Sequence, residues 1–307
     1  MKKFLFTATT ALLLSNLAIS QTTTTTIPTP EQDKSKAEFD KKFRFGLRIA
    51  PQPAWFSSSD NTNNPPYGAK FGFGFGLNME FRLSNIVAFQ TGIGGDFEGG
   101  KLTYRSEPSE NYQVAYWLNN ANEMIEVKDG TNLSDLNTGS NTSVILKERS
   151  IKTTYVSIPA ILKLSTSEYS GLKYFGLFGI ELGARIKSIA KDTYLTTYKY
   201  NSSGVTTSGP GGAGESTNDN INIKNDASLI PIRLGLNVGL GTEYRLGGST
   251  SLFFSVNYFR SFTNLMRSKE SKYLIYNIDN SSGSNKFSYV KQNLIQNAVR
   301  INIGVMF

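Results

Sequence analysis

Two residue types are missing from this chain of 307 residues, which contains no cysteine and no histidine. The absence of cysteine excludes a disulfide framework, a thiol nucleophile and a cysteine-ligated zinc site. The absence of histidine excludes a Ser–His–Asp triad and a histidine-ligated metal centre. The sequence therefore predicts a protein that is not an enzyme and that carries no cofactor and no metal.

Long apolar runs are also scarce. A mostly apolar stretch at 4–19 follows Lys2 and Lys3 and leads into the small residues of "AIS" (18–20). This order predicts a secretory signal peptide over residues 1–20. A membrane anchor is the alternative, but the run is short for a span of about 20 residues. No other segment reaches the ~18 consecutive apolar residues of a helical span.

The chain is basic, with a formal net charge of +8 that falls to +6 without Lys2 and Lys3. Its lysines and arginines are scattered along the sequence, which argues against nucleic acid as a partner. Residues 21–42 hold a threonine run, prolines and alternating charges, and this composition predicts a flexible leader.

Residues 43–307 repeat one pattern, in which ten or more alternating apolar and polar residues are followed by a break. Such alternation has the two-residue period of a β-strand. It predicts eight strands, at 43–55, 67–82, 86–105, 149–164, 172–198, 228–246, 251–262 and 298–307. We expect residues 43–307 to form one domain.

The breaks between the strands alternate in length. Three are tight, at 84–85, 165–171 and 247–249. Four are longer, at 56–66, 106–148, 199–227 and 263–292. In an up-and-down meander this order places all tight turns at one end and all long loops at the other, as in outer-membrane barrels. The sequence predicts an all-β fold, an eight-stranded antiparallel up-and-down transmembrane β-barrel.

The two faces of each strand indicate the environment of the barrel. In the second strand, Phe71, Phe73 and Phe75 alternate with Gly72, Gly74 and Gly76. A soluble barrel would place the apolar face inside, but large aromatic side chains would overfill an eight-stranded interior. We therefore expect the apolar face to contact outer-membrane lipid and the small and polar face to line the lumen.

The same alternation directs several charged side chains inward. They are Glu80, Arg82, Glu181, Arg185, Arg233, Glu243, Arg245 and Arg300. We interpret them as a structural network of charges that fills the lumen. A pair of carboxylates acting as acid and base in hydrolysis is the alternative, for which Glu80, Glu181 and Glu243 are the candidates.

Three further features carry predictions. The chain ends on Phe307 after an alternating strand, which is typical of the C-terminal signal that barrel assembly machinery reads. Aromatic residues near the strand ends predict interfacial girdles: Trp55, Phe56, Tyr67, Tyr104, Tyr244 and Tyr258. Pro159 cannot donate a hydrogen bond, so we expect a bulge or a locally missing bond there.

The long connection 106–148 contains three further aromatic residues, Tyr112, Tyr116 and Trp117. We expect them to be exposed above the membrane, where they could contact a partner or a glycan. Extension of the barrel strands through this stretch is the alternative that we favour. The connection 199–227 is rich in glycine, serine and threonine and shows no chemical signal.

The stretch "TTYVSIPAILKL" (153–164) resembles a strand of the PorT-like family of bacterial outer-membrane barrels, and "GLFGIELGARI" (176–186) resembles the strand that follows it. A typical member has an acidic residue where Ser157 stands. The resemblance implies a barrel without catalytic residues, and some members take part in protein secretion. We expect a structural or interaction component of the cell envelope with envelope or secretion proteins as partners. A narrow pore for small solutes is the alternative.

Overall fold

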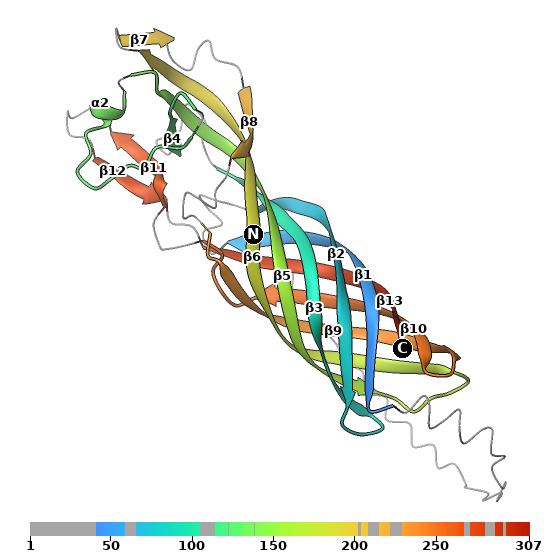
Figure 1. The fold of residues 1–307 in the computed structure, drawn as a ribbon. Helices are drawn as coiled ribbons and strands as arrows, with labels where there is room; N and C mark the ends of the chain where they lie inside the picture. The colour runs from blue at the N-terminus through green and yellow to red at the C-terminus, as the bar shows by residue number, and fades with distance from the viewer. Residues whose placement is uncertain are drawn as a thin grey trace, which may run out of the picture.

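The computed structural model describes residues 41–58, 66–104, 114–121, 123–137, 139–201, 204–207, 215–221, 229–266, 271–279, 286–290 and 293–307. The expected signal peptide, and all but the end of the expected leader, lie outside these residues. Within them, eight long antiparallel strands form a closed barrel (Figure 1). They are β1 (Phe43–Ser58), β2 (Pro66–Arg82), β3 (Val87–Thr103), β5 (Thr142–Ser165), β6 (Leu172–Asn201), β9 (Ile232–Gly247), β10 (Thr250–Ser261) and β13 (Leu294–Met306).

Each barrel strand pairs with the next in chain order, and β13 pairs back with β1 to close the ring. The predicted fold is confirmed. The largest difference from the expected bounds is at β5, which begins seven residues earlier than expected, at Thr142. Next come β9, which begins at Ile232 rather than 228, and β13, which begins at Leu294 rather than 298. Tight turns join β2 to β3, β5 to β6 and β9 to β10, all at one end, here called the short-turn end.

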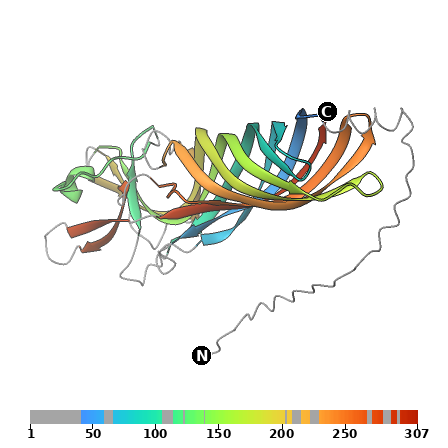
Figure 2. The same ribbon diagram turned by 90° about the horizontal axis from the view of Figure 1, so that it is seen from below.

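The long connections carry the smaller elements. They are β4 (Ala115–Leu118), α2 (Leu133–Leu136), β7 (Gly204–Thr207), β8 (Glu215–Ile221), β11 (Ser271–Asp279) and β12 (Lys286–Val290). All of them gather at the end opposite the tight turns, where β5 and β6 run on beyond the other barrel strands (Figures 1 and 2). No described helix is long and apolar enough to cross a membrane.

The orientation of the barrel wall is the one expected. Phe73 and Ile303 are exposed on the outside, at 42% and 45%, whereas Arg233 and Arg300 are buried in the lumen, at 0% and 1%. Bulky outward side chains fit only an apolar surrounding, so this face is the lipid-contacting surface of the barrel.

Pro159 interrupts the wall on one side only. On the β6 side, the pairing runs through Pro159 opposite Glu181. On the β3 side, it stops at Gly94 opposite Ser157 and resumes at Thr91 opposite Ala160, with the same register before and after. The expected missing pairing is confirmed, and it occurs without a bulge.

The long connections do not form open loops over the barrel mouth, because they enclose a hydrophobic core that we call the cap core. Its buried side chains come from barrel strands and connections: Phe56, Leu102, Tyr104, Val114, Tyr116, Leu118, Met124, Val144, Leu146, Ile151, Ala190, Leu229, Leu265, Met266, Leu274, Val290 and Leu294. A smaller cluster of Trp117, Val127, Leu136 and Ile275 adjoins β4 and β11.

The cap core corrects two expectations. Tyr116 and Trp117 are buried, at 0% and 2%, rather than exposed, because β4 pairs with the extension of β5. Tyr112 lies outside the described residues. Phe56 and Tyr104 are not girdle residues, because they point inward into the cap core. Trp55 and Tyr258 do share the outer face, with ring centroids 6.4 Å apart.

Substitution Ile303→Arg tests the orientation of the wall. Ile303 lies between Ile49 and Phe254 of the neighbouring strands, all on the lipid-contacting face. An arginine there should lower the free energy of unfolding by about 2–4 kcal/mol. Ser167→Arg, on an exposed turn, is the control and should cost less than about 0.5 kcal/mol. Equal losses in denaturant titrations of the refolded protein would contradict the assigned orientation.

Candidate functional site in the barrel lumen

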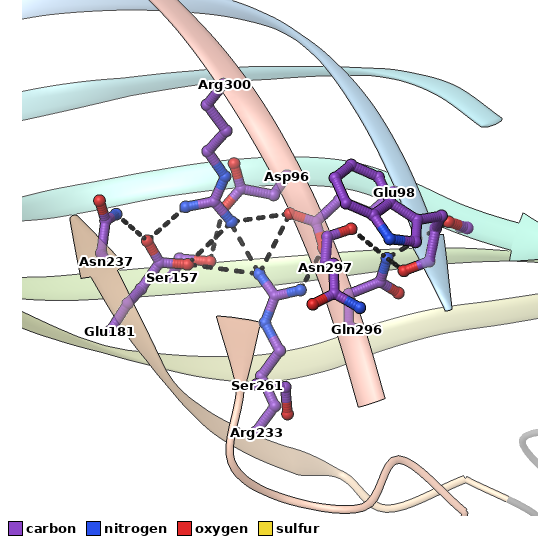
Figure 3. Close-up of polar contacts among 12 residues, drawn as sticks. Asp96, Glu98, Ser157, Glu181, Arg233, Asn237, Ser261, Gln296, Asn297 and Arg300 are labelled. Carbon is purple, nitrogen blue, oxygen red and sulfur yellow. Dashed lines mark hydrogen bonds and ion pairs between the residues drawn. The ribbon is translucent and has the colours of Figure 1, made fainter. Parts of the chain in front are cut away.

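The first group of lumenal charges, here called the upper cluster, includes Asp96 and Glu98 in the half of β3 that is nearer to the cap. Figure 3 shows its polar contacts. Glu98 and Glu181 each bind both Arg233 and Arg300, which closes a ring of four charged groups. Arg300 donates to Glu181 Oε2 at 2.5 Å and to Glu98 Oε1 at 2.7 Å. Arg233 donates to Glu98 and, at 3.3 Å, to Glu181 Oε1. All four side chains are at most 1% exposed.

Asp96 supplies the third carboxylate of the upper cluster. Its Oδ2 accepts a hydrogen bond from Ser157 at 2.5 Å and lies 3.8 Å from Arg300 Nη2 and 3.9 Å from Arg233 Nη2. The guanidinium of Arg48 also acts on Asp96 electrostatically. Three carboxylates therefore face three arginines, and the cluster is neutral.

Aromatic rings and glycines make this charge density possible. The Arg233 guanidinium lies 4.0 Å from the ring centroid of Tyr155 and 4.5 Å from that of Phe259, where the ring quadrupoles attract it. A Cβ atom at Gly183 would lie only 2.9 Å from Arg233 Nε. Alternation of small and large inward residues thus leaves space for the arginines across the narrow lumen.

A second group, here called the lower cluster, lies toward the short-turn end. Arg44 bridges Glu80 and Glu243 at 2.7 and 2.5 Å, and Lys163 bridges the other oxygens of the same carboxylates at 2.8 and 2.7 Å. Ser251 donates to Glu243 Oε1 at 2.7 Å. Both oxygens of each glutamate are engaged by cations, so neither carboxylate is open to a substrate.

A small cavity with both polar and apolar lining residues extends along the lumen from Lys163 of the lower cluster to Glu181 and Arg300 of the upper cluster. Arg48, Asn78, Asn257 and Asn302 are among its lining residues, and the space open to the centres of water molecules is about 30 Å³. About 10–15 Å³ of such space is needed per water, so the cavity holds no more than a few. A solute of metabolite size does not fit.

The two clusters contain five of the eight charged residues expected in the lumen: Glu80, Glu181, Arg233, Glu243 and Arg300. Arg82 lies beside the lower cluster, with its Nε 3.7 Å from Glu80 Oε1. Arg185 is half-buried, and its positive charge interacts electrostatically with Tyr155. Arg245 is displaced to the rim. Its Nη1 lies 3.4 Å from Glu168 in the β5–β6 turn, because it is two residues from the end of β9.

Five members of the clusters were missed in the sequence: Arg44, Arg48, Asp96, Glu98 and Lys163. The signal for them was the same alternation. Asp96 and Glu98 flank the outward Phe97, and Lys163 lies between the outward Leu162 and Leu164.

A further ion pair, outside the two clusters, lies above the lumen in the cap. Arg149 binds Asp192 through two hydrogen bonds of 2.8 and 2.6 Å, and Tyr116 donates to the same carboxylate at 3.1 Å. Burial, and next the charge of Asp192, raise the pKa of the Tyr116 hydroxyl well above its usual range. The hydroxyl therefore keeps its proton and its hydrogen bond at neutral pH.

The geometry offers little for catalysis or metal binding. No group of three or more carboxylates in the described part of the chain is placed to hold a metal ion. The lumenal glutamates serve as partners of arginine and lysine. What the arrangement does chemically is to neutralise charge across the whole width of the lumen.

Phe307 lies at the short-turn end beside the first strand. Its backbone N–H donates to the carbonyl of Phe45 at 2.7 Å, and the two rings are 5.5 Å apart. Its role as an assembly signal remains a prediction.

A closed barrel with an apolar exterior and a charged, filled lumen defines the class of integral outer-membrane β-barrels. The family model for the outer membrane protein beta-barrel domain matches residues 21–267. The chain belongs to this family, and the protein is located in the outer membrane.

Solved structures of similar architecture include three bacterial proteins. Neisserial surface protein A is 13% identical with a TM-score of 0.34, covering 87% of this chain and 96% of that one. OprG of Pseudomonas aeruginosa is 11% identical with a TM-score of 0.39, covering 88% and 98%. Ail of Yersinia pestis is 10% identical with a TM-score of 0.29, covering 87% and 100%. Similarity this low carries no functional argument. No curated protein matches the chain.

Substitution Glu181→Gln tests the stabilising role of the upper cluster. It keeps the shape of the side chain but leaves Arg233 and Arg300 short of one negative charge in a buried site. We expect a loss of about 3–5 kcal/mol in the free energy of unfolding. Glu168→Gln, at a partly exposed rim pair, is the matched control and should cost less than about 1 kcal/mol. Similar losses for both variants would refute a special role for the cluster.

The contact between Ser157 and Asp96 predicts a coupling between two positions. Ser157→Asp places two carboxylates within hydrogen-bond distance and should lower the melting temperature in detergent. The exchange Asp96→Ser with Ser157→Asp restores one carboxylate and one hydroxyl, so it should recover most of the loss. Circular dichroism melts of the single and double variants measure the coupling. Additive effects would show that the two side chains do not interact.

Proposed function

We propose that this protein is a closed, non-conducting outer-membrane barrel that acts as a structural or protein-interaction component of the cell envelope. The observation that supports the closed state is the series of seals along its axis. The cap core covers one mouth, and the upper and lower clusters cross the lumen below it. Opening a path would separate buried ion pairs, at about 3–5 kcal/mol for each unpaired charge.

The cap provides the candidate surface for a partner. It is built on the extensions of β5 and β6, and its smaller cluster is covered incompletely by Ile125, Phe287 and Tyr289. The last two rings meet edge to face at 5.6 Å. Half-buried aromatic residues on a firm β-framework are typical of residues that anchor protein contacts.

The resemblance of residues 153–164 and 176–186 to PorT-like barrels supports a finer proposal, in which the partner belongs to a secretion or envelope complex. In this proposal the protein catalyses no reaction and needs no cofactor. Phe307 would serve barrel assembly and the apolar wall would contact lipid, while the cap would serve the partner.

Conductance measurements across planar bilayers distinguish the closed barrel from the alternative, a narrow pore for small solutes. We expect the wild-type protein to show no steady channel. The double variant Arg233→Ala with Arg300→Ala is the positive arm, because loss of both large side chains opens space in the upper cluster. A steady wild-type channel of reproducible size would overturn the proposal and favour the pore.

Site-specific crosslinking in intact cells tests the interaction role. A photo-reactive residue at position 287 should give one protein adduct of defined mass, identified by mass spectrometry. The same residue at Tyr169, exposed in a short turn, is the control and should not give that adduct. The same adduct from both ends, or none from position 287, would exclude the cap as the contact surface.

A further inference from the structure

Five lysines gather on the outer surface of the barrel near the cap, and we call them the basic patch. They are Lys70 on β2, Lys101 on β3, Lys152 on β5, and Lys187 and Lys191 on β6. These four strands are neighbours in the wall. Lys152, Lys187 and Lys191 are exposed, and Lys70 and Lys101 are partly exposed.

The strand register brings the patch together. Ser150 pairs with Lys101 on one side and with Lys191 on the other. Lys152 lies two residues further along the same face of β5 as Ser150. Lys70 reaches over Gly99, which pairs with Lys152, and its ammonium donates to the Ser150 hydroxyl. The charges of Lys152, Lys101 and Lys191 all act on Lys70.

The patch marks the boundary of the lipid-contacting surface. On β5, the outward side chains change from Ile158, Val156 and Thr154 to Lys152, while the inward side chains become apolar at Ile151. On β2, Lys70 directly precedes Phe71, which is 80% exposed. At the level of the lysines, the apolar side chains therefore change from the outer face of the wall to its inner face. This change is expected where the hydrocarbon of the bilayer ends and the polar headgroups begin.

The patch is confined to one side of the barrel. At this end of β1, β9, β10 and β13, the outward face of the described residues offers one charged side chain, Arg260, beside Trp55 and Tyr258. Within the patch, Glu148 lies 3.5 Å from Lys101. Among the side chains that the structure describes here, one carboxylate against five ammonium groups leaves a local excess of positive charge that an anion would neutralise.

We propose that the basic patch binds a phosphate-bearing lipid headgroup of the outer leaflet. Long loops of outer-membrane barrels face outward, which places the patch at the level of that leaflet's headgroups. Phosphate oxygens meet the lysine ammonium groups, while the acyl chains lie along Phe71, Phe73 and Phe97 below them. A free anion would match only the charged half of this surface.

The test uses the full chain in detergent micelles and native mass spectrometry, with lipid A carrying two phosphates as the probe. The patch variant is Lys101→Gln, Lys152→Gln and Lys187→Gln. A matched control with the same change in charge is Lys41→Gln, Lys42→Gln and Lys128→Gln, all exposed and outside the patch. Each lysine near an anionic lipid raises the binding affinity about five-fold. The patch variant, which lacks three lysines, should therefore bind lipid A about 100-fold more weakly than wild type. The control should stay within about two-fold of wild type.

Two further probes separate the sources of binding. Dephosphorylated lipid A should bind wild type about as weakly as lipid A binds the patch variant, and pyrophosphate alone should not bind in the same concentration range. Saturable pyrophosphate binding of equal strength would replace the lipid with a free-anion site, and equal lipid A binding by both triple variants would overturn the proposal. If the patch variant does not fold, the three single lysine-to-glutamine variants test the proposal instead. Each should bind lipid A about five-fold more weakly than wild type.

Discussion

The constraint on which this structure depends is the width of an eight-stranded lumen. A barrel of this size has room for side chains and little else, so a charge placed inside it must meet an opposite charge across a few ångströms. Glu98 of β3 illustrates the result, because its carboxylate binds Arg233 of β9 and Arg300 of β13, and neither of these strands is a neighbour of β3. The ion pairs therefore stabilise the wall strands against one another across the lumen, in addition to the hydrogen bonds between neighbours.

The interior and the exterior of the barrel follow one alternation, and this explains how much of the fold the sequence could predict. The row of phenylalanines from Phe71 to Phe81 assigns β2 to a wall with lipid on one side, and the same reasoning places Glu80 and Glu243 inside. Asp96 and Glu98 follow the rule equally well. They were not predicted because this part of their strand is rich in glycine, so that Phe97 is the one bulky residue between 94 and 100 that marks the outward face.

The alternation fails where the wall leaves the bilayer. Phe56 and Tyr104 resemble girdle residues in the sequence, but they belong to the cap core, where apolar side chains point inward as in a soluble protein. Nothing in the local pattern tells at which residue this inversion occurs, because it depends on how the long connections fold over the mouth. The burial of Tyr116 depends in the same way on pairing between β4 and β5, and Arg245 reaches Glu168 only because a turn brings them together.

The extension of β5 and β6 beyond the barrel has a mechanical consequence. These two strands pair with each other from the short turn up to Thr142 and Lys199, so the wall and the cap share one hydrogen-bonded ribbon with no linker between them. A ribbon of this kind resists bending far better than a single chain does. The tilt of the barrel in the bilayer therefore sets the orientation of the cap relative to the membrane. A force applied to the cap is transmitted through β5 and β6 to the transmembrane wall.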